Sequence, residues 1–213
     1  MRKKRQHGGA IIEFAFMFPL LVSLVVGTMI YGTELIKELE LQQVARDTAS
    51  MVARGTDFTI TSNQLIVARL GQELGWPVTG LPSSSGVGVV YVSTIEYLDS
   101  TCNGANPVCK NAGHWVFVAS LYFGDKGFRS SNFGAPASCL PGCLDTDNPG
   151  FGNINATDTL NNTGAIVSNF TFLGTPSTGT AGFQPGQLAY LVETAATMGM
   201  WGTGEVGYAY SLF

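Results

Sequence analysis

The sequence of 213 residues predicts an α+β fold, in which a long N-terminal helix packs on a small antiparallel β-sheet. Residues 14–33 form an apolar run without a charge, and apolar residues then recur at helical spacing to about residue 54. Beyond Gly55, short runs rich in Val, Ile, Tyr, Phe and Trp alternate with loops rich in Gly, Pro and Asn, as strands do. An amphipathic helix that precedes such strands buries its apolar face against their sheet.

The long helix is expected to cover about residues 9–54 and to consist of two parts. In the first part, residues 9–33, the uncharged run spans roughly 30 Å, the thickness of a membrane hydrocarbon core. The second part, residues 34–55, is amphipathic and ends at Gly55, a residue type that commonly stops helices. The apolar stripe is expected to pack on the protein's own head, and a partner helix is the alternative. It consists of Leu35, Ile36, Leu39, Leu41, Val44, Ala45, Thr48, Ala49 and Val52.

The remaining residues, 56–213, are expected to form an α+β head outside the membrane. A helix is predicted over residues 63–74, with Ser62 as its N-cap and with Pro77 preventing its continuation. Residues 129–164 contain many turn formers, which predicts a long surface loop rich in Gly, Asn and Thr. Strands are predicted at residues 87–98, 115–123, 165–173, 188–194 and 206–212.

Charge is distributed unevenly along the chain. Eleven Lys and Arg face fifteen Asp and Glu, but four of the basic residues lie between positions 2 and 5, so residues 9–213 carry a formal charge of −8. No basic residue follows Arg129. This balance excludes nucleic acid as the main partner of the head, because nucleic-acid binding selects for clustered Lys and Arg.

The basic cluster also predicts the orientation in the membrane. It precedes the apolar run, which Glu34, Glu38 and Glu40 follow, so the positive-inside rule places the N-terminus in the cytoplasm and the head outside. A cleaved secretory signal peptide has the same polarity. That alternative fits less well, because the run exceeds the apolar length of a signal peptide and no A-x-A site closes it.

Glu13 is an ionisable residue at the start of the apolar run, where such residues are costly and commonly functional. The alternative interpretation is a side chain that reaches back to the lipid headgroups. Its setting favours function: a basic cluster, Gly8, four residues and then Glu13 and Phe14. Cleavage between Gly8 and Gly9 would make Glu13 the fifth residue of the mature chain, and this arrangement resembles the processing site of type IV pilin precursors.

The segment GGAIIEFAFMFPLLVSLVVGTMIYG, with LQQVARDTASMVARG after it, resembles the TadE-like family of tight-adherence pilus proteins over residues 8–55. The resemblance implies a pilin-like fold and a minor pilin or pseudopilin role in pilus assembly, adhesion or secretion. It implies as partners a prepilin peptidase, other pilin subunits, the membrane and its pilus assembly machinery. It implies a bacterial inner-membrane location with a periplasmic head, and the pilus or cell surface after assembly. The matching residues are Glu13, Phe14, Ala15, Pro19, Leu20, Leu21, Gly27, Tyr31, Gly32, Val44, Ala45, Arg46, Ala53, Arg54 and Gly55.

Cleavage would leave a new α-amino group on Gly9 that is largely cationic at neutral pH. Glu13 lies four residues further, about 6 Å along a helix, so its carboxylate can face the ammonium of a neighbouring subunit and fix the register between the two helices. Phe14 belongs to the same expected assembly segment, and Pro19 and Gly27 to the membrane helix. Pro19 removes the backbone bond to the carbonyl of Ala15, which permits a kink; a merely tolerated proline is equally compatible.

Four cysteines lie beyond the apolar run, where an oxidising compartment would form disulfides. Three connectivities are possible, and the local pairs Cys102–Cys109 and Cys139–Cys143 are favoured because a Pro-Gly turn separates the second pair. A metal site that includes His114 and Asp145 is the alternative, although the spacing matches no standard zinc pattern. Asp145 and Asp147 resemble a calcium loop only weakly, because the bidentate Glu is missing.

Enzyme chemistry has little support, since the sequence contains no nucleophile elbow, phosphate-binding loop or paired-His metal motif. We therefore expect neither catalysis nor a cofactor. Two functions compete: a structural or assembly subunit of an extracellular filament, and a permanently anchored module that binds or adheres through its surface loop. Gly8 together with Glu13 favours the first, because a plain anchor needs neither residue.

Overall fold

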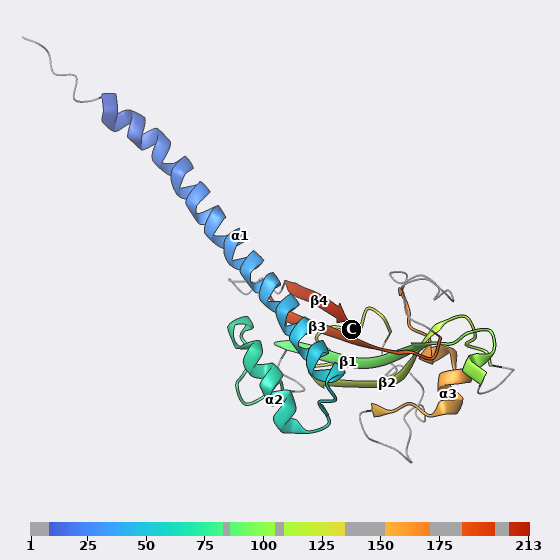
Figure 1. Ribbon diagram of the computed structural model, residues 1–213. Coiled ribbons are helices and arrows are strands. Elements are labelled where there is room, and N and C mark those ends of the chain that lie inside the picture. Colours follow the sequence, from blue (N-terminus) through green and yellow to red (C-terminus); the bar gives the residue numbers. More distant parts are fainter. Residues whose placement is uncertain (1–8, 83–85, 105–108, 135–151, 171–184, 199–204) are drawn as a thin grey trace, which may run out of the picture.

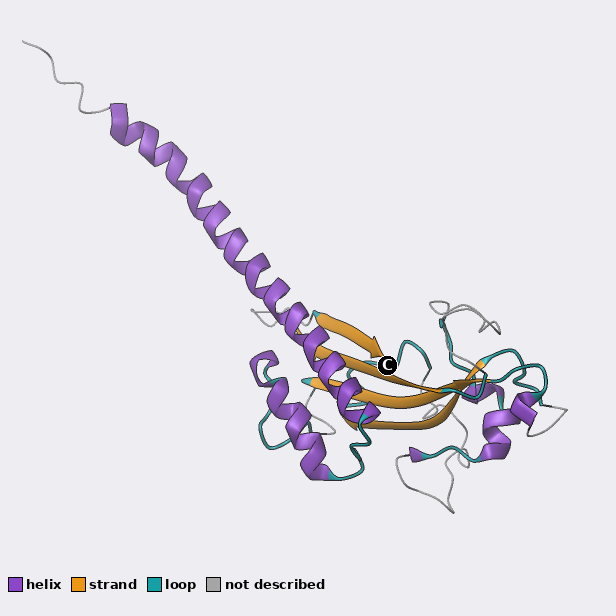
Figure 2. Ribbon diagram, in the orientation of Figure 1, coloured by secondary structure: helices purple, strands orange, loops and turns teal. Residues whose placement is uncertain are grey.

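The computed structural model describes residues 9–82, 86–104, 109–134, 152–170, 185–198 and 205–213. One helix, α1 (Gly9–Ala53), extends far beyond the rest of the molecule, and a sheet packs beside its C-terminal part (Figure 1). The sheet contains β1 (Gly88–Tyr97), β2 (Trp115–Gly124), β3 (Leu188–Thr197) and β4 (Val206–Leu212). Two shorter helices, α2 (Thr61–Leu70) and α3 (Ala156–Asn161), flank it (Figure 2). The predicted α+β class is confirmed.

Helix α1 contains 45 residues, which corresponds to a length of about 68 Å. It ends where the sequence predicts. Gly55 adopts a positive φ of 83°, its N–H donates to the carbonyl of Val52 at 2.8 Å, and the N–H of Thr56 donates to that of Met51 at 3.0 Å. Glycine suits this position because a side chain is strained in the left-handed region. The chain therefore leaves the helix directly toward α2.

The four strands pair in the order β2-β1-β3-β4, and every pairing is antiparallel. The register places Val92 of β1 opposite Leu121 of β2 and Val192 of β3. The register shifts between Thr94 and Ile95 where β1 meets β2, so a bulge lies in that half of the sheet. The two edge strands are thus β2 and β4, and β4 is the last of the four strands along the chain.

One face of the sheet is covered by the C-terminal part of α1 and by α2. The α1 side chains that pack here are fully or almost fully buried, and they contact Val90 and Val92 of β1, Val192 of β3 and Ala209 of β4 in one apolar cluster. A backbone contact adds to this packing, because the hydroxyl of Thr194 donates to the carbonyl of Leu41 at 3.4 Å. The buried α1 residues of the predicted stripe are Leu41, Val44, Ala45, Thr48, Ala49 and Val52.

The first three residues of that predicted stripe do not face the sheet. Leu35, Ile36 and Leu39 are 60%, 61% and 64% exposed, which corrects the prediction that they are buried. At about 100° per residue, these three side chains point away from the side of the helix that carries Leu41. The head does reach this part of α1 on the other side, where the Nζ of Lys37 donates to the carbonyl of Met198. The exposed apolar residues therefore lie on a different side of α1 from the buried stripe.

The opposite face of the sheet is covered by irregular chain, including residues 128–134 and 152–170. Phe133, Ile154 and Val167 pack here against Phe117 of β2 and Leu191 of β3. The predicted strand at residues 165–173 is wrong for its described part, residues 165–170, which holds only an isolated bridge from Ile166 to Val116. Its apolar residues serve to cover the sheet rather than to extend it. Residues 171–173 lie outside the described part.

The second predicted helix is shifted and shortened. Helix α2 begins at Thr61, with Ile60 as its N-cap, so the predicted cap Ser62 lies inside the first turn. It ends before Gly71, a position that only glycine fits, since an added Cβ would lie 2.2 Å from the ring of Trp76. The indole of Trp76 folds back over Gly71, and the chain continues as a short 3₁₀ turn, η1 (Gln72–Leu74).

The predicted surface loop at residues 129–164 is interrupted by α3. Asn155 caps this helix, since its side-chain oxygen accepts a hydrogen bond from the N–H of Thr157 at 2.9 Å. Asn155 has the residue type of a turn, but asparagine favours a helix start as well as a turn. Of this loop, residues 135–151 lie outside the described part.

Candidate membrane and assembly segment

The first part of α1 makes no buried core with the rest of the protein. Within α1, an 18-residue window reaches a mean hydropathy of 2.1 and is entirely unburied. Large apolar side chains are exposed along its length, for example Phe16 at 76%, Leu20 at 68% and Leu24 at 66%. The length and composition suffice for a helix that crosses a membrane, and they favour membrane anchoring.

The serine and threonine hydroxyl groups in this apolar part are bonded to the helix itself. The Oγ of Ser23 donates to the carbonyl of Leu20 at 2.9 Å, and the Oγ1 of Thr28 donates to that of Val25 at 2.8 Å. The Oγ1 of Thr33 does the same to Ile30 at 2.8 Å. These bonds satisfy the hydroxyl donors without water, as a hydrocarbon environment requires.

The predicted processing and assembly residues lie at the start of α1. Gly9 is its first residue, and Gly8 lies outside the described part. Glu13 is exposed one turn along the helix, next to Phe14, which is 66% exposed. The rings of Phe14 and Phe18 lie 5.7 Å apart and tilted, so this end of the helix presents an aromatic pair beside a carboxylate. Both groups are available to another molecule.

Pro19 and Gly27 lie within the continuous helix. The helix continues through Pro19, although proline has no N–H to donate to the carbonyl of Ala15. At Gly27, an added Cβ would meet no atom within 4 Å. Nothing in the described part of the chain therefore requires glycine at position 27, and a requirement would have to come from a neighbouring molecule that approaches the backbone closely.

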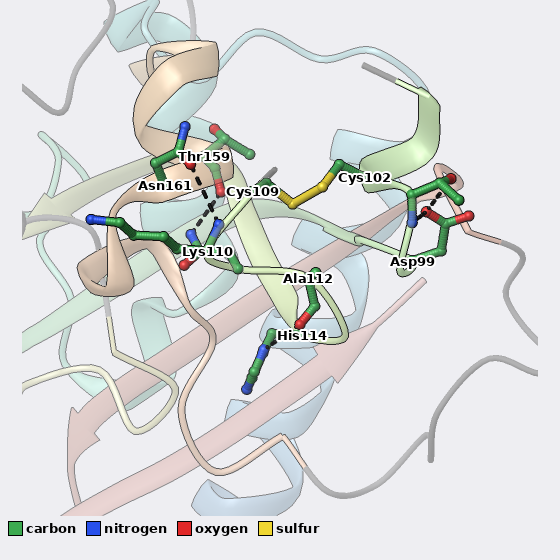
Figure 3. The surroundings of a disulfide bond; sticks show 10 residues. Asp99, Cys102, Cys109, Lys110, Ala112, His114, Thr159 and Asn161 are labelled. Atoms are coloured by element: carbon green, nitrogen blue, oxygen red, sulfur yellow. Dashed lines mark hydrogen bonds between the residues drawn. A yellow bond between two sulfur atoms is a disulfide. The ribbon is translucent and has the colours of Figure 1, made fainter. Parts of the chain in front are cut away.

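The head contains one of the two predicted local disulfides. Cys102 and Cys109 are bonded, with their Cα atoms 6.2 Å apart, in the connection between β1 and β2 (Figure 3). Because both sulfurs are used, these residues are excluded from the metal-site alternative. Among the described residues, no group of three His, Cys, Asp or Glu side chains is placed to hold a metal ion. The other candidate residues, Cys139, Cys143, Asp145 and Asp147, lie outside the described part.

Asn111 and His114 follow the disulfide in this connection. Asn111 is fully buried, and its Nδ2 donates to the carbonyls of Thr159 at 2.8 Å and Asn162 at 2.9 Å, which ties the connection to α3. His114 is exposed, and its Nδ1 lies 3.0 Å from the carbonyl of Ala112 (Figure 3). The geometry gives His114 a structural surface position.

A buried carboxylate that the sequence analysis missed lies on the sheet face opposite α1. Glu193 of β3 is 1% exposed and accepts hydrogen bonds from the Oγ of Ser131, the N–H of Asn132 at 2.8 Å and the hydroxyl of Tyr208 at 2.6 Å. The guanidinium of Arg129 lies 4.3 Å from the centre of the Tyr208 ring. Burial, together with the charge of Glu193, raises the pKa of Tyr208 well above its usual range.

This network holds residues 129–132 against the sheet, and its role is structural. Each of its bonds satisfies a group that burial would otherwise leave unpaired. The only signal in the sequence is that Glu193 is the one charged residue in an otherwise apolar strand. Its partners lie 62 and 15 residues away in the chain, so no local pattern reveals them.

Comparison with known proteins identifies one related segment. Residues 8–50 match the family model described as TadE-like protein, which confirms the resemblance stated from the sequence over that part of the chain. The matched residues include Glu13, Phe14, Pro19 and Gly27. No curated protein and no solved structure matches the chain. The match therefore associates the chain with tight-adherence pili through its N-terminal helix, and not through its head.

Proposed function

We propose that this protein is a minor pilin-like subunit of a tight-adherence pilus, which acts in pilus assembly. The observation that carries the proposal is the first part of α1: an uninterrupted apolar helix that the rest of the protein leaves uncovered, with Glu13 four residues after Gly9. The match of residues 8–50 to the TadE-like family supports the same role.

Processing is the first step of the proposed function. A prepilin peptidase hydrolyses the Gly8–Gly9 bond on the cytoplasmic side and removes the leader with Arg2, Lys3, Lys4 and Arg5. The leader holds the N-terminus in the cytoplasm until then, in accord with the positive-inside rule. Its removal takes four positive charges away from the end of the helix and creates an ammonium group on Gly9.

Assembly then uses the two charges that remain at the end of the helix. The ammonium of Gly9 and the carboxylate of Glu13 lie about 6 Å apart along one helix, too far along the axis to pair at the same level. A neighbouring helix displaced by one turn brings its ammonium level with Glu13. In an apolar bundle each charge is costly when alone, so this pairing favours one axial register over others.

The uncovered surface suits the same step. The exposed apolar side chains leave lipid and pack on other helices when the subunit enters a bundle, and Gly27 offers a place where a neighbouring backbone can approach closely. The head remains in the periplasm, where its disulfide is stable.

N-terminal mass spectrometry of the protein purified from piliated cells tests this proposal. We expect a mature chain that begins at Gly9 and a loss of processing when Gly8 is changed to a bulky residue, with Gly8→Leu as the variant. Gln6→Leu serves as a control in the same leader. A dominant species that retains Met1 would instead support the alternative, a permanently anchored module that binds through its surface.

A further inference from the structure

An apolar ridge is exposed on α1 just beyond the candidate membrane span. It consists of Leu35, Ile36 and Leu39, whose exposed fractions are between 60% and 64%. Leu39 lies six residues after Thr33, about 9 Å along the helix axis. Leu41, two residues later and on the opposite side of the helix, is fully buried against the sheet. The ridge is therefore an apolar surface of α1 that faces away from the sheet.

A groove lies on each side of this ridge. The first has a volume of about 410 Å³ and lies between α1 and α2 with the turn after it; Ile36 and Leu39 line it together with Leu70 and with Glu40, Asp47 and Glu73. The second has a volume of about 340 Å³ and lies between α1 and β4; Leu35 and Val206 line it together with Glu34, Glu38 and Glu205. Each groove thus combines apolar side chains with three carboxylates.

The carboxylates of the two grooves have no cationic side chain among the described residues that line them. Lys37 lies between Glu34 and Glu40 in sequence, but its Nζ donates to the carbonyl of Met198 at 3.2 Å and is therefore directed to the head. Burial raises the pKa of Glu40, and the neighbouring charge of Glu73 raises it further, against the smaller opposing effect of Lys37. In the protein alone, Glu40 is therefore only weakly compensated.

We propose that the ridge and its two grooves dock a helix of a partner protein, whose apolar stripe carries Lys or Arg on both sides. Such a helix covers Leu35, Ile36 and Leu39 with its stripe and places cations over the carboxylates of each groove. Apolar burial supplies attraction, and the flanking charges fix orientation and partner choice, as the outer positions of coiled coils do.

Two other occupants fit this surface less well. A second copy that used the same surface would bring six carboxylates against six, and residues 9–213 carry seven basic residues for fifteen acidic ones. Anionic lipid headgroups would meet the same repulsion. The inference goes beyond the proposed function and does not depend on cleavage at Gly8, so either can fail alone.

A binding experiment with the full chain in neutral detergent micelles tests the proposal. The probe is a synthetic helical peptide with a Leu stripe flanked by Lys on both sides, and the matched control peptide carries Glu in place of Lys. We expect micromolar binding of the Lys peptide by fluorescence anisotropy, weakened as salt rises from about 50 to about 300 mM, and no binding of the Glu peptide.

Charge reversal in the protein separates docking from general attraction to an acidic protein. Glu73→Lys in the first groove and Glu205→Lys in the second are each expected to weaken binding at least about tenfold. Asp158→Lys changes the charge equally on α3, at the other end of the sheet, and is expected to leave Kd within about twofold. Equal losses in all three variants, or binding of the Glu peptide, would overturn the proposal.

Site-specific photo-crosslinking from position 39 in cells identifies the occupant. The expected product joins this protein to a segment whose sequence has an apolar stripe flanked by Lys or Arg, located by mass spectrometry of the linked peptides. A crosslink from position 46, also exposed on α1 but outside both grooves, serves as the control. Products that consist only of a second copy or of lipid would overturn the proposal.

Discussion

The two parts of α1 are one continuous helix, but they have opposite surroundings. Leu24 is 66% exposed and Leu41 is 0% exposed, although both belong to the same helix. Around Leu24 the apolar side chains meet no core of the protein, and from Leu41 onward the buried ones form the centre of one. The helix itself is continuous across this change in surroundings. Apolar residues of the same types are thus exposed to the surroundings of the protein in the first part and stabilise its core in the second.

The largest effect is expected from a change in the first, exposed part of α1. Glu13→Ala removes the carboxylate from the exposed part, and we expect at least about tenfold fewer assembled pili because the neighbouring ammonium loses its partner. Processing and the folding of the head should be unchanged. Electron microscopy counts the pili, and N-terminal mass spectrometry checks processing. Ser23→Ala, which removes a hydroxyl bonded only within the same helix, is the control; normal piliation of the Glu13 variant would contradict the role of this residue.

The next effect tests which side of α1 is buried against the sheet. Leu41→Ala leaves a cavity between α1 and the sheet, and we expect the free energy of unfolding to fall by about 2–5 kcal/mol. Leu39→Ala truncates an exposed side chain of the same type and should change it by less than about 0.5 kcal/mol. Urea unfolding of the full chain in micelles, followed by the fluorescence of Trp76 and Trp115, measures both. Equal losses of unfolding free energy in the two variants would contradict the burial of Leu41 in the core.

A smaller effect is expected from a site remote from either part of α1. Replacing both Cys102 and Cys109 by Ser removes a short loop closure, which is worth about 2.5 kcal/mol in the chain-entropy model. The loss should be confined to the head, with membrane insertion and the processing of Gly9 unchanged. Urea unfolding measures the loss, and carbonate extraction measures insertion. A variant that no longer enters the membrane would show that the two regions are coupled.

The smallest effect concerns Glu40, which lies between Leu39 and Leu41. Because its pKa is raised in the folded state above the ordinary value of 4.5, the folded state holds this proton more tightly than the unfolded one. Stability is therefore lost as the pH rises from about 4.5 through the raised pKa, and the loss persists at neutral pH. Glu40→Gln should raise stability at pH 7 by less than about 0.5 kcal/mol, since the group is only partly buried and solvent screens its charge. Melting temperatures of both proteins between pH 4 and 8 measure it; parallel curves would contradict this assignment.

Local sequence determines the elements that the prediction placed correctly. The bounds of α1 follow from the uncharged run and from the stop at Gly55, both of which act within a few residues. The strands β1, β2, β3 and β4 follow from dense runs of β-branched and aromatic residues bounded by glycine and proline. The resemblance around Gly8 and Glu13 can also be recognised from the sequence, because the basic cluster, Gly8, Glu13 and the apolar run occur there in a fixed order.

Tertiary contacts determine what the prediction missed. Val167 has the residue type of a strand, but it packs over a sheet that is already paired. The end of α2 depends on Trp76 folding over Gly71, and the cluster at Glu193 depends on residues far away in the chain. Leu35 is apolar, but it lies on a side of α1 that does not face the sheet. Periodicity predicts that a face is apolar, but it does not predict which part of the face will be covered.

The strand order has a consequence for biosynthesis. Helix α1 is made first, but the strands it packs on, β3 and β4, are made last. The bond from Thr194 to the carbonyl of Leu41 joins positions 153 residues apart. At translation rates of roughly 5–20 residues per second, the inner side of α1 waits on the order of ten seconds for its cover. A chain that stops before residue 188 lacks β3 and β4 and so covers this face of α1 only in part, and incomplete copies expose apolar surface that proteases and chaperones can recognise.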